Sequence, residues 1–293
     1  MNLKLLASDY FYDPSFTLKV IDRDPELPYP LHSHDFYELV VIISGSGTHF
    51  TKTNTFTLAP GTVFVIPPGL EHGYRNLKEV HLFNVLFDIN MLEDTFADIR
   101  NMPGYHALLR IEPGYHNESG FSNPMQISPA QMAEVLPLLE QMQSECDSIE
   151  HDIGAKSLAI SYFIHLLVLL FRIKAEHPRK DNQTVMRLAE ALSFLEANSD
   201  RSVSTQELME LTNMSASTLN RHFQNATGLS PVEFHIQRRI EYACRLLRSS
   251  DYSMSQIAEA TGFNDANYFS RQFKNVMGMS PREYRNNRTI WYR

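Results

Sequence analysis

The chain has 293 residues, 43% of them hydrophobic, with 12 Gly and 15 Pro, which is ordinary for a soluble globular protein with room for two domains. Its two cysteines, Cys146 and Cys244, exclude a disulfide framework, and the short apolar stretch before Asp9 excludes a signal-peptide core, so we expect a cytoplasmic protein. The net charge of −8 argues at first against a nucleic-acid-binding protein.

Residues 1–90 contain short runs of β-branched and aromatic residues separated by turn-forming residues, such as Gly45-Ser46-Gly47 and Pro67-Pro68-Gly69. The runs are residues 16–21, 37–43, 48–51, 55–58, 63–66 and 80–87. Strands at this spacing predict a β-sandwich or barrel.

Histidines and a glutamate recur within these strands at fixed spacings. The first set reads His32-x-His34-x-x-x-Glu38, and the second reads Gly61-x5-Pro67-x-Gly69-x-x-His72-x-x-x-Asn76. The pattern resembles the two cupin motifs, although Glu26 stands where the first motif begins with Gly. Period two places His32, His34 and Glu38 on one face if that segment stays extended, and a turn at residues 67–69 brings His72 beside them.

Two interpretations of these residues remain open. Three imidazoles and a carboxylate suit Zn²⁺, Fe²⁺, Ni²⁺ or Mn²⁺, so His32, His34, Glu38 and His72 are candidate ligands of a divalent metal. The same groups could instead bind ligand hydroxyls or one another. A small-molecule pocket in the barrel would combine them with the aromatic residues Phe36 and Tyr74.

Helices are expected after an irregular connection at residues 91–127. Ser128 caps a helix in which Pro137 either introduces a kink or starts a new helix ending near Ser148. The apolar run Leu158–Phe171 has 14 residues, fewer than the ~20 of a membrane helix, which predicts a buried helix. Either the barrel or a second subunit could cover it, so a homodimer is one of two alternatives.

The second half of the chain repeats itself. With an offset of 50, residues 215–234 match residues 265–284, including Arg221 with Arg271. Each copy has a capping box, beginning at Ser204 or Ser253, and a helix stop, at Asn213 or Gly262. Ser215 and Asp265 can cap the helices that follow, so each copy predicts a helix-turn-helix.

These motifs, each followed by Gly-x-Ser-Pro, resemble the paired DNA-binding motifs of AraC-type transcription regulators over residues 184–288. The resemblance implies that double-stranded DNA is read at Ser217, Asn220 and Arg221 and at Ala266, Asn267, Ser270 and Arg271. Arg can contact guanine and Asn adenine, but one Arg of the pair could instead contact phosphate. A long helix from Ser230 would separate the two modules by about one DNA turn, ~34 Å.

The charge distribution agrees with this division. From Arg221 onward the chain has 11 Lys and Arg against 6 Asp and Glu, whereas residues 1–180 have 13 against 22. The sequence therefore predicts an α+β protein with three parts. They are a cupin-like β-barrel with a helical packing or dimerisation region at residues 1–176, a linker at 177–183, and an all-α double helix-turn-helix domain at 184–293.

The run from His34 to Glu38, with Gly45-x-Gly47 soon after, is most similar to the rhamnose-responsive regulators. That resemblance implies a sugar or sugar acid as effector, activation of carbohydrate-catabolism genes, and RNA polymerase as a partner. The alternative is a metal-dependent cupin enzyme attached to a DNA-binding domain. We expect no enzyme, because the sequence shows no base or nucleophile beyond the four candidate ligands.

Overall fold

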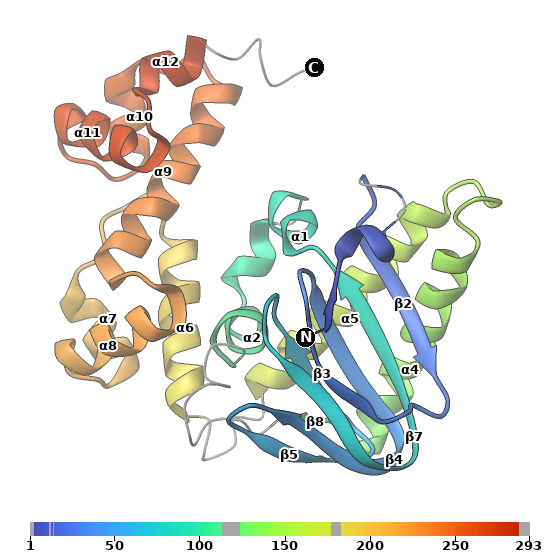
Figure 1. The fold of residues 1–293 in the computed structure, drawn as a ribbon. Helices are drawn as coiled ribbons and strands as arrows, with labels where there is room; N and C mark the ends of the chain where they lie inside the picture. The colour runs from blue at the N-terminus through green and yellow to red at the C-terminus, as the bar shows by residue number, and fades with distance from the viewer. Residues whose placement is uncertain are drawn as a thin grey trace. The chain divides into compact units, whose positions relative to one another are not determined.

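The protein is described by a computed structural model that covers residues 3–11, 13, 15–95, 97–112, 124–176 and 183–286. The chain divides into two compact units, Met1–Met186 and Arg187–Arg293. The first combines a β-sheet with helices, whereas the described part of the second is helical throughout (Figure 1). The predicted α+β class is confirmed. Of the predicted linker, only Gln183 is described, and it begins α6 (Gln183–Ala197).

The first unit contains one eight-stranded sheet in the order β1-β3-β7-β4-β6-β8, with β2 paired to β7 and β5 to β4. The strands are β1 (Leu3–Leu5), β2 (Leu18–Arg23), β3 (Tyr29–His34), β4 (Tyr37–Thr51), β5 (Thr55–Leu58), β6 (Thr62–Ile66), β7 (His72–Phe87) and β8 (Met125–Gln126). All pairs are antiparallel except β1 with β3. The sequence predicted neither β1, β3 nor β8.

Two runs expected as separate strands form the single strand β4. The turn expected at Gly45 is instead an irregular segment, where the register against β7 shifts repeatedly between Ile42 and Thr48. Gly45 has φ +81°, and a Cβ there would overlap the Glu79 carbonyl. Glycine is therefore needed for a bend inside the strand rather than for a chain reversal.

The sheet is apolar on both faces. Leu39 and Val41 of β4 pack with the helices, whereas Val40 and Ile42 pack in the barrel interior with Phe64. A strand that is covered on both faces reads as a continuous apolar run rather than an alternating one. This double burial explains the unbroken sequence Leu39–Ile42.

Two long helices, α4 (Pro129–Asp147) and α5 (Ala155–Glu176), pack beside each other and join the core of the first unit (Figure 1). Shorter helical segments precede them: α1 (Ile89–Thr95), η2 (Ala97–Asn101), α2 (Pro103–Tyr105) and η3 (His106–Ile111). These segments replace much of the expected irregular connection. Helix α4 continues through Pro137 as one helix.

Helix α5 is longer than its apolar run. At 22 residues it is long and apolar enough to span a membrane by length and composition, so length alone does not exclude a membrane helix, contrary to the expectation from the 14-residue run. Leu166 is nevertheless fully buried in the core of the unit, as are Phe163 and Leu170. Packing against the rest of the unit therefore covers one face of α5. His165 and Leu158 lie on the exposed face.

The second unit contains the predicted helices and one more, α12 (Pro281–Asn286), that the sequence did not predict. Besides α6, the others are α7 (Thr205–Thr212), α8 (Ala216–Thr227), α9 (Pro231–Ser249), α10 (Met254–Ala260) and α11 (Ala266–Met277). Ser204 and Ser253 form the expected capping boxes with Glu207 and Gln256. Asn213 ends α7 in the left-handed conformation, with φ 52°. The predicted starts and stops are thus confirmed, because capping and left-handed stops depend on a few neighbouring residues.

Candidate functional site

Three strands assemble the histidine cluster. His32 and His34 lie at the end of β3, Glu38 lies near the start of β4, and His72 begins β7, the strand between β3 and β4 in the sheet. His32 pairs with His72 across the β3–β7 ladder. The four side chains are brought together as expected, but not along one extended segment, because the chain leaves β3 before Glu38. The Gly69 amide donates to the His34 carbonyl at 2.8 Å and fixes the turn that precedes His72.

The carboxylate of Glu38 lies at the centre of the cluster. Its Oε2 is 3.1 Å from His34 Nε2 and 3.8 Å from His72 Nε2. All three side chains are buried, His34 and His72 completely. Their ligand atoms lie within 4.8 Å of one another. His32 flanks this group, with its ring centroid 4.1 Å from that of His72.

Backbone carbonyls orient the imidazoles. His34 Nδ1 lies 2.7 Å from the Phe36 oxygen, and His72 Nδ1 lies 3.2 Å from the Leu70 oxygen. If Nδ1 carries the proton and donates it, a neutral ring presents its Nε2 lone pair to Glu38. The 3.1 Å contact between His34 and Glu38 lacks hydrogen-bond geometry, and within the part of the chain that the structure describes neither Nε2 atom has a hydrogen-bond partner. Such buried acceptors cost free energy until a cation or a donor reaches them.

Burial also sets the protonation states. It lowers the pKa of His72 to about 3, so this ring is neutral at neutral pH. Burial pushes the pKa of Glu38 upward, but its close approach to His34 as a donor, and then the positive charge of the imidazoles in their protonated forms, outweigh burial and hold the pKa below its ordinary value. An ionised carboxylate therefore faces a neutral imidazole.

These donors fit a divalent metal. Two imidazole nitrogens and one carboxylate oxygen suit Zn²⁺ or Fe²⁺, and donors about 2.1 Å from one ion lie roughly 3–4 Å apart. The separations of 3.1 and 3.8 Å lie in that range. His34, Glu38 and His72 are thus the residues that could hold an ion. His32 is not part of this three-residue group.

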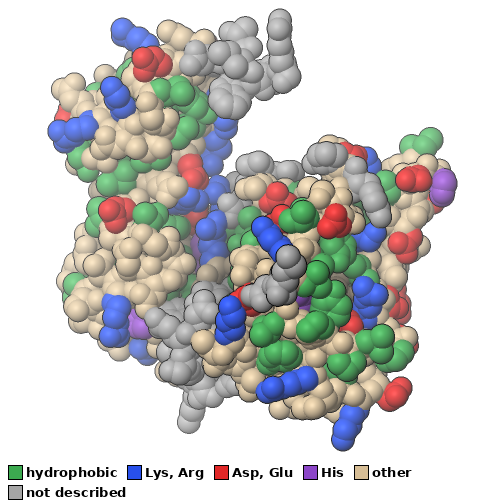
Figure 2. Space-filling model, viewed as in Figure 1, with side chains coloured by type: hydrophobic (Ala, Val, Ile, Leu, Met, Phe, Trp, Pro, Cys, Tyr) green, Lys and Arg blue, Asp and Glu red, His purple; other side chains and the backbone are tan. Residues whose placement is uncertain are grey.

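A pocket of about 250 Å³ opens beside the cluster. Four of the six predicted ligand residues line it, namely His32, Phe36, Glu38 and Tyr74, whereas His34 and His72 do not. Leu27, which is 67% exposed, borders the pocket. Hydrophobic side chains also gather on the visible face of the sheet unit (Figure 2).

Several pocket residues were not predicted from the sequence. Tyr10, Arg23, Glu26 and Asn84 contribute polar groups to the lining. The buried Tyr74 Oη and Asn84 Oδ1 have no hydrogen-bond partner among the described residues. Burial raises the pKa of Glu26. The strand pairing of Asp22 with Phe83 and of Arg23 with Leu82 places Arg23 near Asn84, but only the register reveals this, because β2 and β7 are distant in sequence.

His49 is a further buried histidine that sequence patterns missed. It stacks at 4.7 Å on Phe56, and its ring centroid is 5.6 Å from that of His72. It pairs with Tyr74 across the β4–β7 ladder. The bend near Gly45 interrupts the alternation from Glu38, so counting by twos along the sequence could not place it.

The predicted base-reading residues lie on α8 and α11. Ser217, Asn220, Arg221, Asn267 and Arg271 are exposed, and Ala266 and Ser270 are half-buried. Behind them, Leu219 and Phe223 of α8 and Phe269 and Phe273 of α11 are fully buried. Each helix therefore anchors one apolar face in its module and presents the opposite face to solvent.

Two of these side chains have internal contacts. Ser270 Oγ donates to the Ala266 carbonyl at 2.8 Å, which occupies its hydroxyl proton. The Arg271 guanidinium lies 5.3 Å from the ring centroid of Tyr268. Stacking of this kind keeps the guanidinium extended, with its hydrogen-bond donors available.

Known protein families match both units. A family model described as an AraC-like ligand binding domain matches residues 19–167, and one described as a helix-turn-helix domain matches residues 208–287.

Curated relatives align over most of the chain. The HTH-type transcriptional activator RhaS of Escherichia fergusonii is 31% identical over 267 residues, 91% of each chain. The HTH-type transcriptional activator RhaR of Enterobacter sp. (strain 638) is 27% identical over 92% of this chain and 91% of that protein. Among solved structures, a transcriptional regulator with an AraC-type DNA-binding domain from Chromobacterium violaceum is 32% identical over 35% of this chain and 91% of its own, with a TM-score of 0.33.

Proposed function

The chain belongs to the AraC-type transcription regulators, and from that premise we propose that it is an activator whose barrel pocket binds a sugar or sugar acid and thereby controls DNA binding. We assign effector binding to residues 1–176, a linker to 177–183, and DNA binding to 184–293. The relatives are regulators rather than enzymes, so an enzyme attached to a DNA-binding domain is not supported.

One observation supports the effector proposal above the others, the unsatisfied polar atoms that line the pocket. Tyr74 Oη and Asn84 Oδ1 are buried with no hydrogen-bond partner in the described ranges, and Glu38 lines the same pocket. A ligand that carries several hydroxyl groups can supply the missing hydrogen bonds, whereas an apolar ligand would leave them unmade. The volume of about 250 Å³ suits one sugar ring better than an oligosaccharide.

Arg23 at the rim favours a sugar acid among these ligands. Its side chain is 52% exposed, and its Nε lies 4.0 Å from Glu26 Oε2, too far for a hydrogen bond. The guanidinium could therefore turn toward a ligand carboxylate, which it can bind in a bidentate manner. Arg23→Met should weaken the binding of a uronate more than that of the matching neutral sugar, and isothermal titration of both ligands measures the difference.

We also propose that His34, Glu38 and His72 hold a divalent transition metal. The support is the orphaned Nε2 atoms of both histidines beside a buried carboxylate. A bound ion would supply positive charge for ligand oxygens at the pocket wall. Elemental analysis after metal-replete expression decides: less than roughly 0.2 equivalents of any transition metal would contradict this proposal.

A thermal-shift screen of sugars and uronates, with and without EDTA, tests the effector proposal. A ligand that binds only the folded protein stabilises it, by about 2.7 kcal/mol at a hundred times its dissociation constant. A hit should lose its effect in Glu38→Ala and His34→Ala while basal DNA binding is retained. Unfolding of the barrel unit by either substitution would mean that these groups are structural.

The remaining proposals concern partners. Family resemblance supports RNA polymerase as a partner and the cytoplasm as the location. For a homodimer, the exposed face of α5 is the place to test, since Leu166 is buried within the chain and Leu158 is 47% exposed. Leu158→Glu should dissociate a dimer in sedimentation without unfolding it, and a wild-type monomer at tens of micromolar would contradict the proposal.

A further inference from the structure

The two helix stops of the repeat use different residues in the same conformation. Asn213 has φ 52° and Gly262 has φ 71°, and both lie in the left-handed region. Since Asn is accepted at the first position, conformation alone does not require Gly at the second. The surroundings differ, because Asn213 is exposed whereas Gly262 is half-buried.

Gly262 lies directly against the backbone of Arg201. A Cβ at Gly262 would be 2.5 Å from Arg201 Cα, 2.6 Å from its carbonyl carbon and 2.9 Å from its nitrogen. Carbon atoms in favourable contact lie about 3.5–4.0 Å apart, so a side chain there must push the two backbones apart by about 1 Å. Glycine at 262 is therefore required by close approach, between the second module and the loop that leads into the first.

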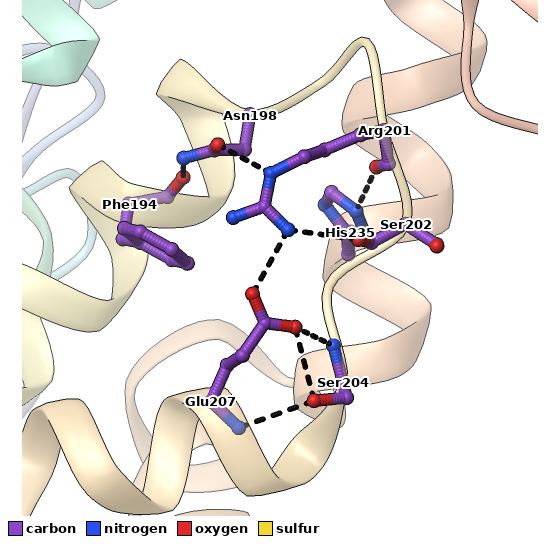
Figure 3. Close-up of polar contacts among 7 residues, drawn as sticks. All are labelled: Phe194, Asn198, Arg201, Ser202, Ser204, Glu207 and His235. Carbon is purple, nitrogen blue, oxygen red and sulfur yellow. Dashed lines mark hydrogen bonds and ion pairs between the residues drawn. The ribbon is translucent and has the colours of Figure 1, made fainter.

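The loop at Arg201 is held from several sides (Figure 3). The Arg201 guanidinium donates to Asn198 Oδ1 at 2.8 Å, at the end of α6, and to Glu207 Oε1 at 2.9 Å, in the capping box of α7. It also lies 5.4 Å from the ring centroid of Phe194. The Arg201 carbonyl accepts from His235 Nε2 of α9 at 2.9 Å. The loop thus connects α6, α7 and α9.

The turn at Gly262 is held by the same helix. Arg239, which is 7% exposed, donates from Nε to the Thr261 carbonyl at 2.7 Å, and its Cζ lies 3.7 Å from the ring centroid of Phe263. His235 and Arg239 are four residues apart on α9 and share one face. One side chain holds the loop before the first module, and the next holds the turn of the second.

We propose that this junction, formed by Arg201, His235, Arg239 and Gly262, sets the spacing between α8 and α11 and therefore the separation of the two base sequences that the protein accepts. Helix α7 begins four residues after Arg201, and α11 begins four residues after Gly262. A displacement of the junction therefore moves both modules. Gly262 and Arg201 act as positioning residues, and the proposal rests on α8 and α11 reading bases of one duplex.

Gly262→Asn in the full chain tests the junction, because Asn tolerates the left-handed conformation and adds only the clash. Asn213→Gly is the matched control at the equivalent position of the first module. The probes are a duplex selected from random DNA by the wild-type protein, and its derivatives with one base pair inserted or removed between the two contacted segments. Binding is measured by fluorescence anisotropy, and folding by circular dichroism.

We expect Gly262→Asn to bind the selected duplex at least about tenfold more weakly and to lose or shift the wild-type preference among the three spacings. Asn213→Gly should retain both affinity and preference. Arg201→Ala is the second variant, for use if Gly262→Asn fails to fold. The Arg201 side chain is 43% exposed, so its removal releases the loop without adding bulk and should broaden the preference among the three spacings.

Equal weakening on all three duplexes, or wild-type behaviour of both variants, would overturn the proposal. If the wild-type protein binds all three duplexes equally well, α8 and α11 do not both read bases of one duplex. That result would contradict the proposed mode of DNA binding, and with it the role of the junction.

Discussion

In the sheet unit, the candidate functional side chains are buried, and some of their polar atoms have no hydrogen-bond partner among the described residues, whereas most candidate side chains of the helical unit are exposed. His34 and His72 are completely buried beside Glu38, and both have an orphaned Nε2. Asn220 and Arg271 lie in solvent on helices whose other face is packed. The first arrangement has an energetic cost in the absence of ligand, and the second has almost none. Binding to the barrel should therefore be strongly coupled to stability, and binding to DNA should not.

The largest effect should come from a buried charge in the sheet unit. Lys174 of α5 forms an ion pair with Glu112, and both side chains are largely buried. Lys174→Met should lower the unfolding free energy by about 3–5 kcal/mol, because it removes the buried positive charge that Glu112 faces. The matched change in the helical unit, Arg221→Met, should stay within about 0.5 kcal/mol. Urea unfolding of both variants makes the comparison, and equal values would contradict the difference between the units.

Glu38→Gln should have the next largest effect on stability. Because the pKa of Glu38 is held below its ordinary value, the folded protein favours the ionised carboxylate, so replacing it with a neutral amide should cost the ligand-free protein about 1–3 kcal/mol. Stabilisation by the effector should be lost at the same time. Glu134→Gln, at an exposed position of α4, is the control. A stabilised Glu38→Gln would mean that an amide donor to His34 Nε2 outweighs the loss of the carboxylate charge.

Arg271→Ala tests the exposed candidate residues of the helical unit. It should cost about 1–3 kcal/mol in binding to the selected duplex, relax the preference at one base pair, and leave the unfolding free energy unchanged. Arg282→Ala, an exposed arginine of α12, is the control. Titration of operator variants at two salt concentrations distinguishes the alternatives: equal weakening on all sequences would indicate a phosphate contact at Arg271.

The smallest expected effect is on the pH dependence of stability, and it comes from His235, a histidine of the helical unit that is buried rather than exposed. Burial lowers its pKa, and the charges of Arg239 and Arg201 act in the same direction. The unfolded state therefore binds the proton more readily, so stability should fall as the pH drops below about 6.5, by at most about 1.4 kcal/mol per unit. His235→Gln can still donate to the Arg201 carbonyl and should show a shallower acid slope. Identical slopes in urea unfolding between pH 7 and 5 would contradict this.

Sequence patterns were reliable where a few neighbouring residues determine the structure. The capping boxes at Ser204 and Ser253 and the stop at Asn213 depend on contacts within one or two turns, and the repeat supplied each signal twice. The cupin-like spacing likewise predicted that Glu38 and His72 lie close together.

The features that the sequence analysis missed or misinterpreted all depend on contacts between residues far apart in the sequence. Gly45 was interpreted as a turn residue. The contact that requires glycine there is with the Glu79 carbonyl of β7, which the local sequence does not show. His49 and Arg23 reach the site only through the register of β4 and β2 against β7. The close approach of Gly262 to Arg201 also joins residues that are far apart in the sequence. No local pattern contains such information.

The most direct test of the account is the affinity of the full chain for its selected duplex, measured by anisotropy with and without a saturating effector from the screen. In the wild type we expect the effector to tighten DNA binding by about 5–150-fold, with DNA tightening effector binding by the same factor, as linkage requires. In Glu38→Gln the effector should change neither. An effector that binds in the barrel but leaves the DNA affinity of the wild type unchanged would contradict control of DNA binding by the pocket.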